Sequence, residues 1–185
     1  MITNYLLAFL MVLMMWCTAI AGEASPLYVH ANGFGPVKIG MTPQQASELI
    51  GMPLLRHNNV EHDGCYYVYP SGDYSSMGYM VQDGQIVRID VRDQEIKTLS
   101  GLSVGSKEDE IQSKFKSKVR IREHPYGRGA HYVSVKVDGG NRLLFETHAQ
   151  KRIEALDGQI LFDDYRISSF RIGKPSTVSL IEGCL

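Results

Sequence analysis

The sequence lacks an excess of either charge, and this balance excludes several classes of protein. Its 185 residues contain 19 lysines and arginines against 20 aspartates and glutamates, for a net charge of −1. Capture of nucleic acid or of an anionic membrane surface by charge requires a clear positive excess, so neither is expected. The hydrophobic content of 44% is too high for a disordered tail, and three cysteines are too few for a disulfide-dense miniprotein.

The sequence also lacks the common motifs of catalysis and cofactor binding. It contains no Walker loop, dinucleotide fingerprint, H-E-x-x-H pair, EF-hand loop or kinase signature. Residues 101–105 match the G-x-S-x-G pattern of hydrolases, but that pattern requires a helix to begin directly after the serine. Here the expected helix is capped further along, at Ser106. We therefore predict no cofactor and no catalytic residues, and rank a hydrolase that uses Ser103 third among the functions.

One polar segment carries residue types that bind metals. Four of them lie just before Cys65, namely His57, Glu61, His62 and Asp63. Their spacing matches no established zinc pattern, and the surrounding residues indicate a solvated loop. We therefore predict no metal ligands here. His124 and His131 are interpreted as strand or turn residues rather than as general bases.

The first residues form a hydrophobic segment that differs sharply from the rest. Residues 5–21 contain no charged side chain, and the small residues at its end allow cleavage after Ala21 or Ala24 under the A-x-A rule. We therefore assign residues 1–24 to a signal peptide and predict a periplasmic or secreted protein. Because no lysine or arginine precedes the segment, an uncleaved N-terminal anchor is the alternative, and only that form would contact a membrane.

Loss of the signal peptide leaves two cysteines, Cys65 and Cys184. Neither lies in a C-x-x-C motif or a basic cluster, where reactive thiols are found. Two cysteines in an exported chain most simply form one disulfide bond. We expect this bond to attach the C-terminus to the first sheet.

The remaining chain is interpreted as α+β, with two tandem units at residues 25–95 and 96–185. Thr42, Pro43 and Gln45 have the pattern of a capping box before a short helix that ends at Gly51, and a similar pattern returns at residues 104–115. Strand-like segments follow each helix, at residues 65–69, 77–82, 85–91, 119–122, 131–137, 142–147 and 165–172. We expect each unit to be a short helical segment packed on a small antiparallel sheet. A single α+β domain without duplication is the alternative.

Residues 148–164 have no counterpart in the first unit. They mix lysine, arginine and glutamate with isoleucine and leucine, and we expect them to form a loop or a short helix between strands. Long insertions in compact domains are often functional. The segment is therefore a candidate contact surface.

Tyrosines gather in the first unit and are the candidate protein-binding residues. They are Tyr66, Tyr67, Tyr69, Tyr74 and Tyr79. Tyrosine is favoured at interfaces because it buries a rigid ring and keeps a polar tip. Strand alternation places Tyr67 and Tyr69 on one face of the sheet and Tyr66 on the other. Packing of these rings in the core is the alternative interpretation.

These motifs resemble known families. The pattern of residues 35–42 followed by a helix that ends at Gly51, repeated at residues 101–106, resembles the tandem units of beta-lactamase inhibitory protein and the single unit of BamE-type envelope proteins. Nearly the whole mature chain is also similar to a family of uncharacterised exported proteobacterial proteins, through residues 83–91, 101–105, 124–126, 131–132, 144–147 and 182–184. These resemblances imply sheet faces or loops that present a surface to another protein.

We therefore expect an exported, non-enzymatic protein-binding module, an inhibitor or immunity protein that acts on an envelope-targeted enzyme. An accessory factor of outer-membrane or cell-envelope assembly is the alternative, as the BamE resemblance implies, and a hydrolase or metal enzyme comes third. The expected partner is another protein. Neither a nucleic acid nor a small-molecule cofactor is expected.

Overall fold

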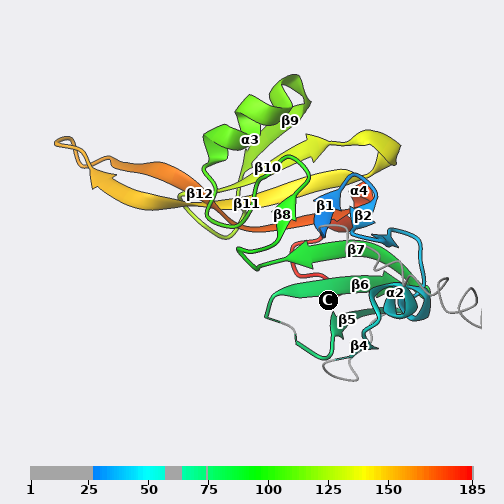
Figure 1. Ribbon diagram of the computed structural model, residues 1–185. Helices are drawn as coiled ribbons and strands as arrows, with labels where there is room; N and C mark the ends of the chain where they lie inside the picture. Colours follow the sequence, from blue (N-terminus) through cyan, green and yellow to red (C-terminus); the bar gives the residue numbers. More distant parts are fainter. Residues whose placement is uncertain (1–26, 57–63, 74, 185) are drawn as a thin grey trace, which may run out of the picture.

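The computed structural model describes residues 27–56, 64–73 and 75–184, and β-strands dominate them (Figure 1). The strands are β1 (Tyr28–His30), β2 (Gly33–Phe34), β3 (Val37–Lys38), β4 (Leu54–Leu55), β5 (Cys65–Pro70), β6 (Met77–Gln82), β7 (Gln85–Val91), β8 (Lys97–Thr98), β9 (Val119–Glu123), β10 (Ala130–Lys136), β11 (Arg142–Glu154) and β12 (Ile160–Gly173). The helices are α2 (Pro43–Ile50), α3 (Glu108–Phe115) and α4 (Pro175–Val178), with short 3-10 turns at η1 (Lys116–Lys118) and η2 (Asp138–Gly140). The predicted signal peptide, the histidine-rich segment at residues 57–63 and Tyr74 lie outside the described residues.

The expected fold class is wrong, because the strands of both halves belong to one sheet. Eight strands form an antiparallel sheet in the order β4-β5-β6-β7-β12-β11-β10-β9, and four short strands form a separate sheet in the order β3-β2-β1-β8. Strands β7 and β12 join the two halves, with Phe170 opposite Val91 and Ile172 opposite Ile89. In two separate small sheets, each of these buried apolar strands would be an exposed edge. Their pairing removes both edges.

Local structure follows the sequence patterns closely. The Thr42 hydroxyl accepts a hydrogen bond from the Gln45 amide, and the Gln45 side chain accepts one from the Thr42 amide, which confirms the capping box of α2. Strands β6 and β7 have the predicted bounds, and Asp83 and Gly84 between them both have positive φ, as a tight hairpin turn requires. The N-cap of α3 is Lys107 and not the predicted Ser106.

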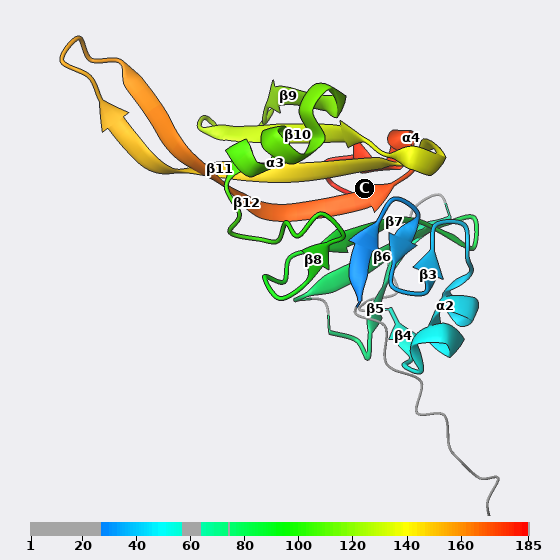
Figure 2. The ribbon, with the colours of Figure 1, turned by 45° about the horizontal axis from the view of Figure 1, so that its top comes forward.

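The core lies on one face of the large sheet. Helices α2 and α3 and the small sheet all cover this face (Figure 2). Ala46 of α2 and Ile111 of α3 are fully buried there, in the same cluster as Val29 and Val37 of the small sheet. The largest buried side chains that the big sheet contributes to this core are Tyr79, Phe145, Phe170, Ile86, Ile89, Ile167 and Ile172. The small sheet therefore completes the core and is not an independent unit.

The buried Tyr79 should make the protein less stable at alkaline pH. Burial raises the pKa of Tyr79 to about 12, from about 10 in an unfolded chain. The folded state holds this proton more tightly, so the stabilisation is complete below pH 10 and is lost as the pH rises through 12. We expect the free energy of unfolding to fall by about 2 kcal/mol from this group between about pH 8 and pH 11.5.

Urea unfolding of the wild type and of Tyr79→Phe at these two pH values checks this expectation. The variant keeps the ring and lacks the titrating proton, so its unfolding free energy should fall less than that of the wild type. An equal fall in both proteins would contradict the assignment to Tyr79.

Candidate functional site

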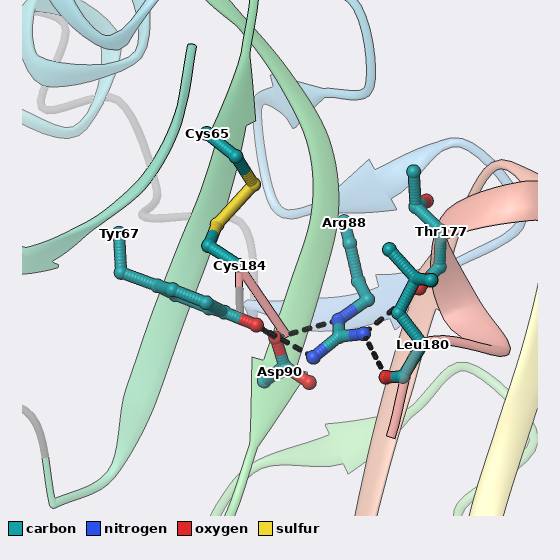
Figure 3. Close-up of a disulfide and its surroundings, with 7 residues drawn as sticks. All are labelled: Cys65, Tyr67, Arg88, Asp90, Thr177, Leu180 and Cys184. Atoms are coloured by element: carbon teal, nitrogen blue, oxygen red, sulfur yellow. Dashed lines mark hydrogen bonds and ion pairs between the residues drawn. A yellow bond between two sulfur atoms is a disulfide. The ribbon is translucent and has the colours of Figure 1, made fainter. Parts of the chain in front are cut away.

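A disulfide and a buried arginine hold the C-terminal tail against the large sheet (Figure 3). Cys65 on β5 and Cys184 in the tail form the predicted disulfide. Beside it, Arg88 on β7 donates hydrogen bonds from Nη1 to the backbone carbonyls of Thr177, at 2.8 Å, and Leu180, at 2.7 Å. The tail and α4 therefore cover the face of the sheet opposite the core.

Two arginines on neighbouring strands share this task. The Arg88 Nε atom donates to Asp90, at 3.0 Å, and its Nη2 atom donates to the hydroxyl of Tyr67. Arg171 on β12 lies directly opposite Asp90 and donates from Nε to the carbonyl of Val178, at 2.7 Å. Because both guanidinium groups are buried and bonded to the backbone of the tail, we interpret this polar cluster as structural.

The five predicted protein-binding tyrosines do not form one surface. Tyr79 is 1% exposed and lies in the core. Tyr66 packs against the same core, whereas Tyr67 and Tyr69 stack on the opposite face, with ring centroids 5.9 Å apart. Burial raises the pKa of Tyr67, whose hydroxyl belongs to the polar cluster under the tail. Tyr74 lies outside the described residues, so three half-buried rings on two different faces remain.

The predicted insertion at residues 148–164 is part of a β-hairpin that projects from the sheet (Figure 1). The expected loop or short helix is therefore wrong. Strands β11 and β12 stay paired out to Glu154 and Ile160. Their neighbours stop earlier, since β10 pairs with β11 only up to His148 and β7 pairs with β12 only from Phe170 onward. We call residues 150–164, which are two-stranded, the arm.

The arm exposes apolar side chains along its length. Ile153 and Leu161 form a cross-strand pair, and each is about half exposed, while Leu156 at the tip is fully exposed. Among the described segments, none outside the arm forms a backbone hydrogen bond with it. At its base, the ring of Phe162 lies against Gly129, where a Cβ atom would come within 2.4 Å of the ring. A side chain at position 129 would therefore displace the ring of Phe162 from the base of the arm.

A hollow of about 580 Å³ lies at the base of the arm. Phe162 and Tyr165 of β12 form one wall, and residues 123–131, which connect β9 to β10, form the other. The second wall contributes His124, Tyr126 and His131. Aromatic and histidine rings thus dominate the hollow, and rings of this kind are typical of surfaces that bind side chains of other proteins.

A buried carboxylate orients one of these rings. The Nδ1 atom of His131 donates to Glu108 at 2.9 Å, and the hydroxyl of Thr147 donates to the same oxygen. Glu108, in the first turn of α3, is 7% exposed, and the ring of His131 stacks on Tyr165 at 4.1 Å. The Nε2 atom of His131 has no hydrogen-bond partner in the part of the chain that the structure describes. With Nδ1 donating to the carboxylate, the Nε2 atom of the neutral ring can accept a hydrogen bond at the wall of the hollow.

The sequence does not indicate this carboxylate–histidine pair, since it predicts His131 only as a strand or turn residue. The two residues are 23 positions apart and come together only because α3 packs on β9, β10 and β12. No sequence pattern predicts contact between a residue at the start of a helix and a strand residue 23 positions later.

Ser103, the position considered for catalysis, has no base or nucleophile geometry among the described residues. Ser103 lies in a turn before α3, where its amide donates to the hydroxyl of Ser106 at 3.2 Å. Within residues 27–56, 64–73 and 75–184, no three metal-binding side chains gather. In the same ranges no helix has the length and apolar character needed to cross a membrane. His57 and His62 fall outside these ranges.

Comparison with known proteins identifies a similar fold. No protein-family model and no curated protein matches the chain. Among solved structures, the uncharacterised protein yfeY from Escherichia coli is similar, with a TM-score of 0.54 and 19% identity over 80% of this chain and 99% of that chain. An extracellular protein containing an SCP domain from Bacillus anthracis matches at a TM-score of 0.42 and 12% identity, over 75% of this chain and 45% of that chain. The first similarity shows a shared fold.

Proposed function

We propose that this chain is an exported, non-enzymatic protein-binding module that contacts its partner with the arm and the hollow at its base. The observation that carries the proposal is the exposure of Ile153, Leu156 and Leu161 on a two-stranded projection. A hairpin of two strands is marginally stable alone in water, and its apolar side chains gain free energy when another surface covers them. The disulfide between Cys65 and Cys184 is compatible with an exported protein.

We further propose that the partner is an envelope-targeted enzyme, which the module inhibits or to which it confers immunity. A narrow projection fits a concave surface, and active-site clefts are the deepest concave surfaces of most enzymes. The ring-lined hollow would receive a side chain from the rim of such a cleft. Tyr126 supports this role, because its ring is exposed and its hydroxyl is held by Glu182, at 3.0 Å.

A matched pair of leucine variants tests the proposal. Leu161 on the arm and Leu49 on α2 are both 50% exposed, so an aspartate costs a similar amount of stability at either position. With the purified mature protein as bait in an envelope extract, we expect Leu161→Asp to reduce capture of the specific partner at least about tenfold, because it places a charge in an apolar contact. Leu49→Asp should capture as much partner as the wild type.

Replacement of residues 152–162 by Asn-Gly provides the stronger form of the test. Lys151 and Asp163, which pair in the hairpin, would then flank a two-residue turn, so the hairpin closes near the edge of the sheet. We expect this variant to remain folded and to capture none of the partner that mass spectrometry identifies with the wild type. The inhibitor proposal also requires that the captured protein be an enzyme whose activity the wild type lowers. Equal capture by all variants would refute the role of the arm.

A further inference from the structure

A second cavity, remote from the arm, lies between the small sheet and the second half of the large sheet. Its volume is about 310 Å³, and it shares no lining residue with the arm or the hollow. The inner wall is apolar, formed by Val29 of β1, Leu143 of β11 and Ile172 of β12, all of which are buried. Phe115, at the end of α3, and Val137 extend this wall toward the surface.

The mouth of this cavity differs from its interior in polarity. Lys118 and Lys136 line it together with a single carboxylate, Asp138. Asp138 lies 3.9 Å from Lys118, and both side chains are largely exposed, so this ion pair is weak. Lys136 has no ion-pair partner among the described residues. The mouth thus carries a net positive charge at the entrance to an apolar interior.

Leu99 adds an apolar residue at the lip. It follows β8 and is 73% exposed, although its backbone amide is fixed by a hydrogen bond to the carbonyl of Val29, at 2.7 Å. A large apolar side chain held rigidly in water beside an apolar cavity gains free energy only when a ligand covers it.

We propose that this cavity binds a single-chain anionic amphiphile, a medium-length alkyl carboxylate, with the chain inside and the carboxylate between the two lysines. The volume lies at the lower end of the range for small-molecule sites, about 300–1,000 Å³, and therefore suits one alkyl chain and not a two-chain lipid. The positive mouth selects the anionic headgroup. This site is independent of the proposed protein-binding function.

Titration calorimetry with sodium decanoate and sodium hexanoate tests the proposal on the mature protein. Each methylene that enters the apolar interior should tighten binding by about fourfold, so decanoate should bind about two hundredfold more tightly than hexanoate. Decan-1-ol and decyltrimethylammonium, used below their aggregation limits, test the headgroup. The neutral alcohol should bind several-fold more weakly than decanoate, and the cation should bind most weakly.

Variants separate this site from adventitious binding. Ala31→Phe fills the cavity and should abolish decanoate binding, whereas Ala155→Phe, at another half-buried alanine, should have no effect. The double variant Lys118→Gln/Lys136→Gln should bind decanoate about fivefold more weakly and bind the alcohol as tightly as the wild type does. Because both lysines are exposed, this variant should fold, and it keeps the test valid if Ala31→Phe does not fold. The proposal is overturned by the absence of saturable decanoate binding, by equal affinity for alcohol and carboxylate, or by undiminished binding in folded Ala31→Phe.

Discussion

Loss of the disulfide, in Cys65→Ala/Cys184→Ala, is expected to lower the free energy of unfolding by about 5 kcal/mol. The bond joins residues 119 positions apart, and the chain-entropy model gives a stabilisation of this size for a loop of that length. It is the largest single effect we expect, and it is comparable with the total stability of many domains. Urea unfolding under non-reducing conditions measures it.

Reduction provides the control for this experiment. The wild type with dithiothreitol should match the double variant without it, because both remove the same cross-link, whereas dithiothreitol should not change the variant. A loss below about 1 kcal/mol in both cases would show that the unfolded chain stays compact without the bond, or that the arginine contacts alone hold the tail.

Replacement of Arg88 by methionine is expected to cost about 3–5 kcal/mol. The side chain is 4% exposed, and its removal leaves the buried Asp90 carboxylate without its ion-pair partner, along with the carbonyls of Thr177 and Leu180. Breaking one half of a buried ion pair costs more than the pair contributes, because the remaining charge stays buried. The measurement is again urea unfolding, read by tyrosine fluorescence and by circular dichroism.

Two further variants show whether the unpaired buried charge of Asp90 causes the loss of stability in Arg88→Met. Arg88→Met/Asp90→Leu removes both charges and should recover at least about 1 kcal/mol relative to Arg88→Met. Arg166 forms a similar pair with Asp164, also two positions away, but this pair is partly exposed. Arg166→Met should therefore cost less than about 1 kcal/mol. Equal losses for Arg88→Met and Arg166→Met would contradict the role of burial.

Local features of this fold could be predicted from the sequence, whereas the sheet order could not. The capping box at Thr42 and the turn at Asp83 and Gly84 depend on residues that are adjacent in the chain, and both are confirmed. The pairing of β7 with β12 depends on which apolar edges meet after the two halves have formed. Alternation within a strand indicates its buried face and gives no information about its neighbour.

The arm was missed for a different physical reason. Apart from Phe162, which packs on Gly129, most of its side chains face solvent, so it has no continuous apolar stripe with a period of two residues, which is the usual signal for a strand. One local signal was present. Asp157 and Gly158 lie at the tip, where Gly158 has a φ of 81° and its amide bonds to the carbonyl of Ala155, at 2.9 Å. The same dipeptide had correctly indicated the hairpin of the first half.

The candidate site was predicted only in part. Residues 148–164 form a β-hairpin and not the expected loop or short helix, and their role as a contact surface stays a prediction. Tyr79 and Tyr67 stand among the candidate binding residues, with core packing as the alternative, because spacing alone does not distinguish a ring that packs the core from one that faces water. Glu108 and His131 are brought together only by the packing of α3 on the sheet, so the sequence alone does not predict their contact.

The position of the disulfide sets an order of events during biogenesis. For a chain exported N-terminus first, Cys65 reaches the oxidising compartment while its partner, 119 residues behind, is still on the other side of the membrane. In such a chain the bond can therefore form only after translocation has passed Cys184. The last strand, β12, ends at Gly173, so all the strands of the common sheet precede Cys184 and cross before the bond can close.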